Sequence, residues 1–204
     1  MDINVLRIVR YVAFASIAVL MFAVLAVTFG WMQSDRQATL SSPGAPIAAF
    51  NLIDAKNQPV SERDVIGRPS VMFFGFTNCP DVCPTTLASM TALLGQMGGD
   101  ADRLRVYFVT VDPARDTPDQ LGEYLSPFDR RIRGLTGAPD QIAALTRSLS
   151  VYYAKVQTGN GSYTMDHTAS VFLLDAQGRF VGTIAYGEDA DVALAKLRRL
   201  AAMS

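Results

Sequence analysis

The longest uncharged stretch of the chain runs for 24 residues, from Tyr11 to Ser34. A helix rises about 1.5 Å per residue, so a helix of that length can cross a bilayer core of about 30 Å. Arg7 and Arg10 precede the stretch and only Arg36 follows it closely, so the positive-inside rule predicts a cytoplasmic N-terminus. The sequence therefore predicts one membrane anchor followed by a domain outside the cytoplasm.

A cleaved signal peptide is the alternative interpretation of this stretch. The apolar region of a signal peptide usually spans only about 7–15 residues, and no persuasive small-x-small cleavage site follows Gly30. We therefore expect a cytoplasmic tail at residues 1–10, a transmembrane anchor at 11–34, a flexible linker at 35–46 and one folded domain at 47–204. Such a chain is expected in the bacterial inner membrane, with a single span and a periplasmic domain.

The part of the chain after the anchor has an ordinary composition. Its 170 residues carry 16 basic and 18 acidic side chains, a net charge of −2. This balance gives no basic surface of the kind that binds nucleic acid. A domain of this length buries about 70% of its unfolded surface, so it can form a normal hydrophobic core.

Short apolar runs bounded by turn residues predict the strands. Residues 71–76 and 106–111 are almost continuously apolar, as in central strands buried on both faces, and residues 151–156 are interpreted in the same way. Residues 169–175 and 179–187 flank a short turn and predict a β-hairpin. Helices are predicted at residues 85–97, 117–125, 139–149 and 189–203. This order predicts an α/β domain with a central mixed sheet and helices on both faces.

The chain contains only two cysteines, Cys79 and Cys83, and one histidine, His167. Zinc fingers and zinc ribbons need four Cys or His ligands, so they are excluded. A disulfide-rich scaffold is excluded because at most one bridge can form. An enzyme that needs an imidazole would have to use His167.

Both cysteines lie in the segment FTNCPDVCPTT (76–86), between the predicted strand 71–76 and the predicted helix 85–97. The positive end of a helix favours thiolate over thiol, so the pKa of at least one cysteine is expected to be lowered. Three residues separate the cysteines, so within one helical turn their sulfurs can hold one soft ion or form a disulfide. A purely structural disulfide is a weak alternative, because closing so short a loop stabilises a fold by only about 2 kcal/mol.

His167 precedes the predicted strand 169–175, so it is expected at an end of a strand of the sheet, as is the cysteine loop. Two thiolates and one neutral imidazole suit Cu(I), because sulfur ligands select soft metals. Asp166 is a candidate for the group that orients the imidazole by accepting a hydrogen bond.

Three segments resemble the Sco/SenC family of membrane-anchored copper proteins that help to assemble cytochrome c oxidase. They are the cysteine loop FTNCPDVCP (76–84), the segment VTVDPARDTP (109–118) and Asp166-His167-Thr168. The predicted anchor and the order of elements match as well, so the resemblance covers essentially the whole chain.

The resemblance implies that residues 47–204 form a thioredoxin-like domain in which Cys79, Cys83 and His167 bind copper, as Cu(I) or Cu(II). It implies a metallochaperone and not a classical enzyme. The implied target is the binuclear CuA site of oxidase subunit II, reached by copper delivery, thiol reduction or both. Other copper chaperones and thioredoxin-like reductants are further implied partners. Asp112 is implied to matter through a partner contact or through the geometry of the site.

Two enzymatic alternatives stay open. A thiol-disulfide oxidoreductase would use the cysteine pair without His167. Thioredoxin-type enzymes, however, usually have two residues between their cysteines, and a proline where this chain has His167-Thr168. A peroxiredoxin-like peroxidase would need a threonine and an arginine beside its cysteine, for which Thr77 and Arg115 are the candidates.

Several further residues have a simpler interpretation. Met90 and Met97 recur at helical spacing and are interpreted as core side chains, whereas Met165 adjoins the histidine and is left open. The basic group formed by Arg130, Arg131 and Arg133 is interpreted as a solvated face.

Overall fold

The computed structural model describes Phe14, Met21 and residues 44–159 and 161–203. The predicted cytoplasmic tail at 1–10, the predicted anchor at 11–34 and most of the predicted linker at 35–46 lie outside the described residues, apart from Phe14, Met21 and residues 44–46. Among the residues that are described, no helix is both long enough and apolar enough to cross a membrane.

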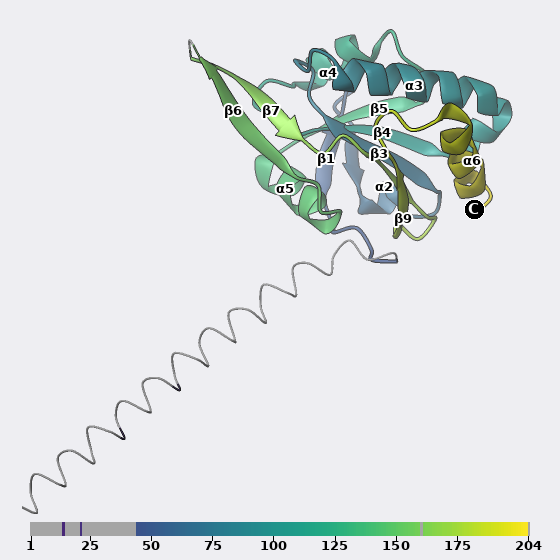
Figure 1. The fold of residues 1–204 in the computed structure, drawn as a ribbon, viewed down its shortest axis with the longest axis horizontal. Coiled ribbons are helices and arrows are strands. Elements are labelled where there is room, and N and C mark those ends of the chain that lie inside the picture. Colours follow the sequence, from purple (N-terminus) through teal and green to yellow (C-terminus); the bar gives the residue numbers. More distant parts are fainter. Residues whose placement is uncertain (1–13, 15–20, 22–43, 160, 204) are drawn as a thin grey trace, which may run out of the picture. The chain divides into compact units, whose positions relative to one another are not determined.

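A seven-stranded mixed sheet forms the centre of the domain (Figure 1). Its strands, in chain order, are β1 (Asn51–Asp54), β2 (Pro59–Ser61), β3 (Ser70–Gly75), β4 (Arg105–Thr110), β5 (Ile132–Thr136), β8 (Val171–Leu174) and β9 (Phe180–Ile184). In space the order is β2-β1-β5-β4-β3-β8-β9. Strands β3, β4 and β5 are parallel, whereas β1, β2, β8 and β9 pair with their neighbours in the antiparallel sense. The predicted central strands at 71–76 and 106–111 and the predicted hairpin are confirmed.

Helices cover both faces of this sheet, with α3 along one face and α5 on the other (Figure 1). Their bounds are α2 (Glu62–Val65), α3 (Val82–Met97), α4 (Pro118–Leu125), α5 (Pro139–Ser148) and α6 (Ala190–Ala201), and a 3₁₀ helix at Gly98–Arg103 follows α3. All four predicted helices are present. Every residue of β3 is buried, because both faces of this strand are covered.

The interpretation of residues 151–156 as a third buried central strand is wrong. The strand β6 runs from Tyr153 to Gly159 and pairs only with β7 (Ser162–His167), in a separate two-stranded sheet. Figure 1 shows this β6–β7 hairpin projecting from one end of the domain. Five of the seven residues of β6 are exposed, since no second layer covers the strand. An apolar run of this length does not by itself distinguish a buried strand from one arm of a hairpin.

The direction of the strands brings distant segments to one edge of the sheet. Strands β3 and β4 are parallel, so the cysteine loop after β3 and the segment after β4 lie side by side. Strand β8 runs antiparallel to β3, and Val171 pairs with Phe73, so the start of β8 lies beside the end of β3. The hairpin ends at His167, four residues before Val171, and this places the histidine at the same edge as the cysteines.

Candidate metal centre

The cysteine loop passes directly into α3, whose first residue, Val82, lies three positions before the predicted start of the helix. Asp81 occupies the N-cap position, and its carboxylate accepts a hydrogen bond from the Thr85 hydroxyl at 3.3 Å. Cys83 therefore lies in the first helical turn, with Pro84 beside it, where the missing N–H of proline costs no intrahelical bond. Cys79 remains in the loop and is partly exposed.

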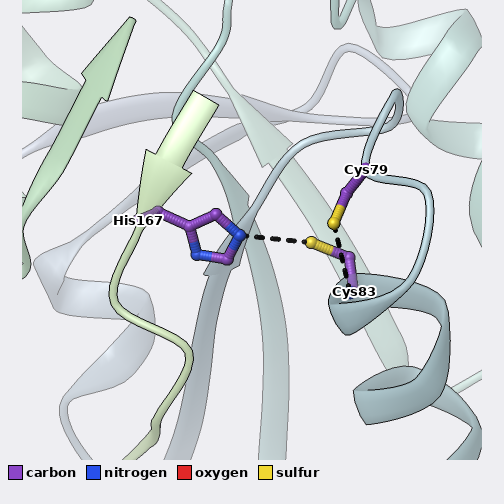
Figure 2. Close-up of side chains that lie close together, drawn as sticks. All are labelled: Cys79, Cys83 and His167. Carbon is purple, nitrogen blue, oxygen red and sulfur yellow. Dashed lines mark hydrogen bonds between the residues drawn. The ribbon is translucent and has the colours of Figure 1, made fainter. Parts of the chain in front are cut away.

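Cys79, Cys83 and His167 come together as the sequence predicts. Their sulfur and nitrogen atoms all lie within 4.8 Å of one another, the one such grouping of three or more Cys, His, Asp or Glu side chains found among the described residues. Figure 2 shows the imidazole pointing from the end of β7 toward the Cys83 sulfur, with 3.5 Å between Nε2 and Sγ. The backbone N–H of Cys83 donates to the Cys79 sulfur at 3.4 Å (Figure 2).

Burial dominates the chemistry of Cys83. Its side chain has no exposed surface and packs against Gly75 of β3 within the hydrophobic core. Burial raises the pKa of the Cys83 thiol well above its ordinary value, although a backbone hydrogen bond from Phe76 acts in the opposite direction. The sequence predicts a lowered pKa for at least one of the two cysteines, and at Cys83 the shift is in the opposite direction because desolvation disfavours the thiolate.

The orientation of His167 leaves its Nε2 atom directed at the cysteines. Nδ1 lies 3.0 Å from the carbonyl oxygen of Thr168, which can only accept, so Nδ1 carries the proton and donates. The edges of the imidazole and two phenyl rings meet, with centroid distances of 6.2 Å to Phe73 and 5.8 Å to Phe76. The prediction that Asp166 orients the imidazole is wrong, because Asp166 is exposed and the Thr168 carbonyl accepts from the ring.

Asp116 anchors the cysteine loop, a role that sequence reasoning missed. Its carboxylate is 1% exposed and accepts from the backbone N–H of Thr77 at 3.0 Å and from the Thr77 hydroxyl at 2.6 Å. The same carboxylate accepts from the Thr110 hydroxyl, at the end of β4, at 2.6 Å. The start of the cysteine loop is thus tied to the neighbouring strand. The signal is present in the VTVDPARDTP segment, in which a second aspartate follows the first.

Asp112 lies in the same segment and is 4% exposed. Its carboxylate forms an ion pair with Arg115 and accepts from the Tyr163 hydroxyl at 3.0 Å. Burial and the bond to this carboxylate raise the pKa of Tyr163, so the hydroxyl stays protonated and donates. Asp112 therefore connects the loop after β4 to the hairpin that ends at His167.

The remaining predicted residues divide into two groups. Met90 and Met97 are buried in the core, as predicted, and Met165 is partly buried against it. Arg130 and Arg133 are exposed, as the interpretation of a solvated face predicts, whereas Arg131 is only partly exposed. Arg131 forms an ion pair with Asp129 at 2.6 Å and donates to two carbonyls at the C-terminal end of α3. Arg133 forms an ion pair with Asp54 at 2.9 Å.

Comparisons with known proteins agree with this fold and site. Yeast (Saccharomyces cerevisiae) protein SCO2, mitochondrial, is 33% identical over 174 residues, which are 82% of this chain. The chain spans 58% of the length of that yeast protein. The solved structure of Bradyrhizobium japonicum ScoI with copper bound superposes with a TM-score of 0.72 and 44% identity, over 76% of this chain and 99% of that one. Arabidopsis thaliana ScoI with copper bound gives a TM-score of 0.72 and 30% identity, over 78% of this chain and all of that one.

These likenesses identify the fold as the Sco-like form of the thioredoxin fold, with its central mixed sheet. The family model named SCO1/SenC matches residues 39–202, which is most of the chain and includes both cysteines and the histidine. The chain belongs to the SCO1/SenC family.

Proposed function

We propose that this protein is a membrane-anchored copper chaperone, which binds copper through Cys79, Cys83 and His167. In this proposal it serves the assembly of cytochrome c oxidase, at the CuA site of subunit II. The observation that carries the proposal is the convergence of two sulfurs and one imidazole nitrogen within 4.8 Å, although the histidine is 84 residues from Cys83.

The donor set fits a soft metal ion. Two thiolates and one neutral imidazole select Cu(I) over the hard cations that prefer oxygen ligands. The buried sulfur of Cys83 resists ionisation on its own, and a bound cation supplies the opposite charge that makes its thiolate stable there. The Thr168 carbonyl, by accepting from Nδ1, fixes the imidazole with Nε2 available as a ligand.

Copper is cargo in this proposal, so it has to leave the site as well as enter it. Cys79 is partly exposed and Cys83 is buried, so an incoming ligand from a partner would reach the ion from the Cys79 side. The relatives from Bradyrhizobium japonicum and Arabidopsis thaliana, both solved with copper bound, support copper as the cargo. We place the domain in the bacterial periplasm, held by an anchor at residues 11–34 with the N-terminus in the cytoplasm.

The test is an anaerobic titration of the reduced domain with Cu(I), in competition with a chromogenic chelator. The parent is expected to bind one equivalent. Cys79→Ala, Cys83→Ala and His167→Ala are each expected to weaken binding by at least about tenfold, since a lost ligand leaves the ion under-coordinated. Thr85→Val serves as the control, because Thr85 is exposed and lies on the same helical turn as Cys83. Equal affinity in all five proteins would refute the proposal.

A thiol-disulfide reductase activity is the second candidate, and one observation favours it. Both cysteines are free thiols, and Cys79 is the more accessible of the two. The Cys79 thiolate would attack a disulfide of the target and form a mixed disulfide. Cys83 would then resolve it, releasing the reduced target and leaving a Cys79–Cys83 disulfide. A thioredoxin-like reductant would be needed to restore the two thiols.

The two candidates predict different results for His167→Ala. Full reductase activity with lost copper binding would favour thiol exchange, whereas loss of oxidase assembly in the same variant would favour copper delivery.

The contacts of Thr77 and Arg115, the two residues that a peroxidase would need beside its cysteine, argue against that activity. The hydroxyl of Thr77 donates to Asp116, and Arg115 pairs with Asp112, so both groups are engaged away from the cysteine sulfurs.

A further inference from the structure

The β6–β7 hairpin carries His167 but does not belong to the central sheet. Side chains two residues apart on a strand lie on the same face, so Tyr163, Met165 and His167 share one face of β7. Met165 is packed against the core and His167 against the phenyl rings of β3 and the cysteine loop. This face of the hairpin is therefore the one that rests on the body of the domain.

Tyr163 forms the contact at the other end of this face. Its hydroxyl donates to Asp112 at 3.0 Å, and its carbonyl oxygen accepts from Arg115 Nη1 at 3.0 Å. The Arg115 guanidinium lies 3.8 Å from the centroid of the Tyr163 ring, and the Lys155 amine lies 3.6 Å from it. Both hydroxyl and backbone of Tyr163 are thus held by the segment that follows β4.

The same arginine reaches toward the metal ligands. The guanidinium carbon of Arg115 lies 5.9 Å from the centroid of the Phe76 ring, and that ring meets the edge of the His167 imidazole at 5.8 Å. Asp112 is almost fully buried and fixes Arg115 by their ion pair. Tyr163 and His167 are therefore joined twice, through β7 itself and through the side chains of Arg115 and Phe76.

We propose that Tyr163 is a positioning residue for His167, which holds the hairpin on the loop after β4 so that the imidazole stays within reach of Cys83. Tyr163 does not contact the ligand atoms, so its effect passes through the hairpin. The proposal rests on the copper function above only for its consequence in metal binding. The docking of the hairpin can be measured without any metal.

The first experiment measures amide hydrogen exchange in the reduced, metal-free protein. Tyr163→Phe removes the hydroxyl bond and keeps the ring, and we expect exchange in β7 to become at least about fivefold faster, the effect of losing one bond to a charged acceptor. Tyr152→Phe is the matched control, because Tyr152 precedes the same hairpin and is 60% exposed. The control is expected to match the parent. Unchanged exchange in Tyr163→Phe would overturn the proposal.

The second experiment asks whether Tyr163 acts through His167. Cu(I) affinity is measured for the parent, Tyr163→Phe, His167→Ala and the double variant. Apparent affinity scales with the fraction of molecules whose hairpin is docked, so Tyr163→Phe is expected to weaken binding about three- to tenfold. In the His167→Ala background the same change is expected to alter affinity by less than about twofold. Equal losses in both backgrounds, or no loss in the parent background, would contradict the proposal.

These outcomes separate the two proposals. Failure of the parent to bind Cu(I) would remove the copper function and leave the exchange result as the test of docking. Should Tyr163→Phe not fold, as judged by its circular dichroism spectrum, Arg115→Lys replaces it in both experiments. A lysine keeps the charge beside Asp112 but cannot reproduce the planar contact with the Tyr163 ring and carbonyl.

Discussion

The sulfur of Cys83 lies against the backbone of Gly75, so closely that a β carbon at position 75 would stand 2.7 Å from it. The same β carbon would lie 2.7 Å from Cε2 of Phe108. A glycine in β3 is thus what allows the second cysteine to reach the sheet, and with it the edge where His167 lies.

Gly75→Ala is therefore expected to destabilise the reduced, metal-free domain by about 1–3 kcal/mol, because a packed core must shift to accept the methyl group. Urea unfolding followed by circular dichroism measures the change. Gly95→Ala is the control, since Gly95 lies in α3 and a β carbon there would meet no neighbouring group within 4 Å. That variant is expected to gain about 0.5–1 kcal/mol from helix propensity. Equal stability of the two variants would show that the close approach carries no cost.

Thr77→Val removes a hydroxyl that donates to Asp116 at 2.6 Å. The buried carboxylate then loses one of its partners, so the free energy of unfolding is expected to fall by about 1–2 kcal/mol. Thr85→Val makes the same chemical change at an exposed position and is expected to stay within about 0.5 kcal/mol of the parent. Thermal unfolding of both variants checks this, and a Thr77→Val protein as stable as the parent would show that the bond from the hydroxyl is not needed to anchor the loop.

The hydrogen bonds from Arg131 hold the pKa of Asp129 below its ordinary value. The unfolded chain therefore binds a proton at Asp129 more readily than the folded domain does. The resulting stabilisation is fully present above the unfolded pKa of about 3.9 and is lost as the pH falls through the lower, folded value. Asp129→Asn is expected to be less stable at pH 7 by about 1–2 kcal/mol and to lose less stability on acidification.

Urea unfolding at a series of pH values from neutral to acidic measures this slope. Asp100→Asn is the control at neutral pH. Asp100 is exposed, and its carboxylate lies 3.9 Å from Nε of an equally exposed Arg103. Removing such a surface pair is expected to change stability by less than about 0.5 kcal/mol. If Asp129→Asn lost as much stability on acidification as the parent does, other carboxylates would be responsible for the pH dependence.

Cu(I) is expected to stabilise the folded domain, because the site does not exist in the unfolded chain. Free ion at about one hundred times its dissociation constant adds about 2.7 kcal/mol to the free energy of unfolding. Differential scanning calorimetry under anaerobic conditions should show a higher Tm, reversed by a Cu(I) chelator. The Cys79→Ala/Cys83→Ala double variant should show no such shift, and an equal shift in that variant would place the bound copper elsewhere.

Much of the fold is predictable from local pattern. The runs at 71–76 and 106–111 are apolar because β3 and β4 are covered on both faces, and proline at the start of α4 and α5 marks both helices. Strand β5 is not predicted, because Arg133 and Gly134 interrupt its apolar pattern. Gly134 is there for a packing reason, since a β carbon at that position would lie 2.7 Å from Leu125 of α4. The partner of a strand is a tertiary property, which explains the error over β6.

The convergence of Cys79, Cys83 and His167 could be predicted because the chain has so few soft donors. The surrounding groups could not, since their roles depend on contacts between segments far apart in sequence. Proximity in sequence favours Asp166 as the group that orients His167, but neighbouring side chains on a strand point to opposite faces. The acceptor is instead the carbonyl of Thr168. The burial of Cys83, which raises the pKa of its thiol, likewise follows from its position against Gly75 of β3 and not from the sequence of the cysteine loop.

The separation of 84 positions between Cys83 and His167 also determines when the site is complete. During synthesis the two cysteines leave the ribosome long before the histidine, and β3 lacks its neighbour β8 until that later part of the chain arrives. Pairings between such distant segments form late, because the entropy of loop closure opposes them. Until then the chain offers an incoming ion only two thiols, so binding through all three of the proposed ligands would have to follow folding of the domain.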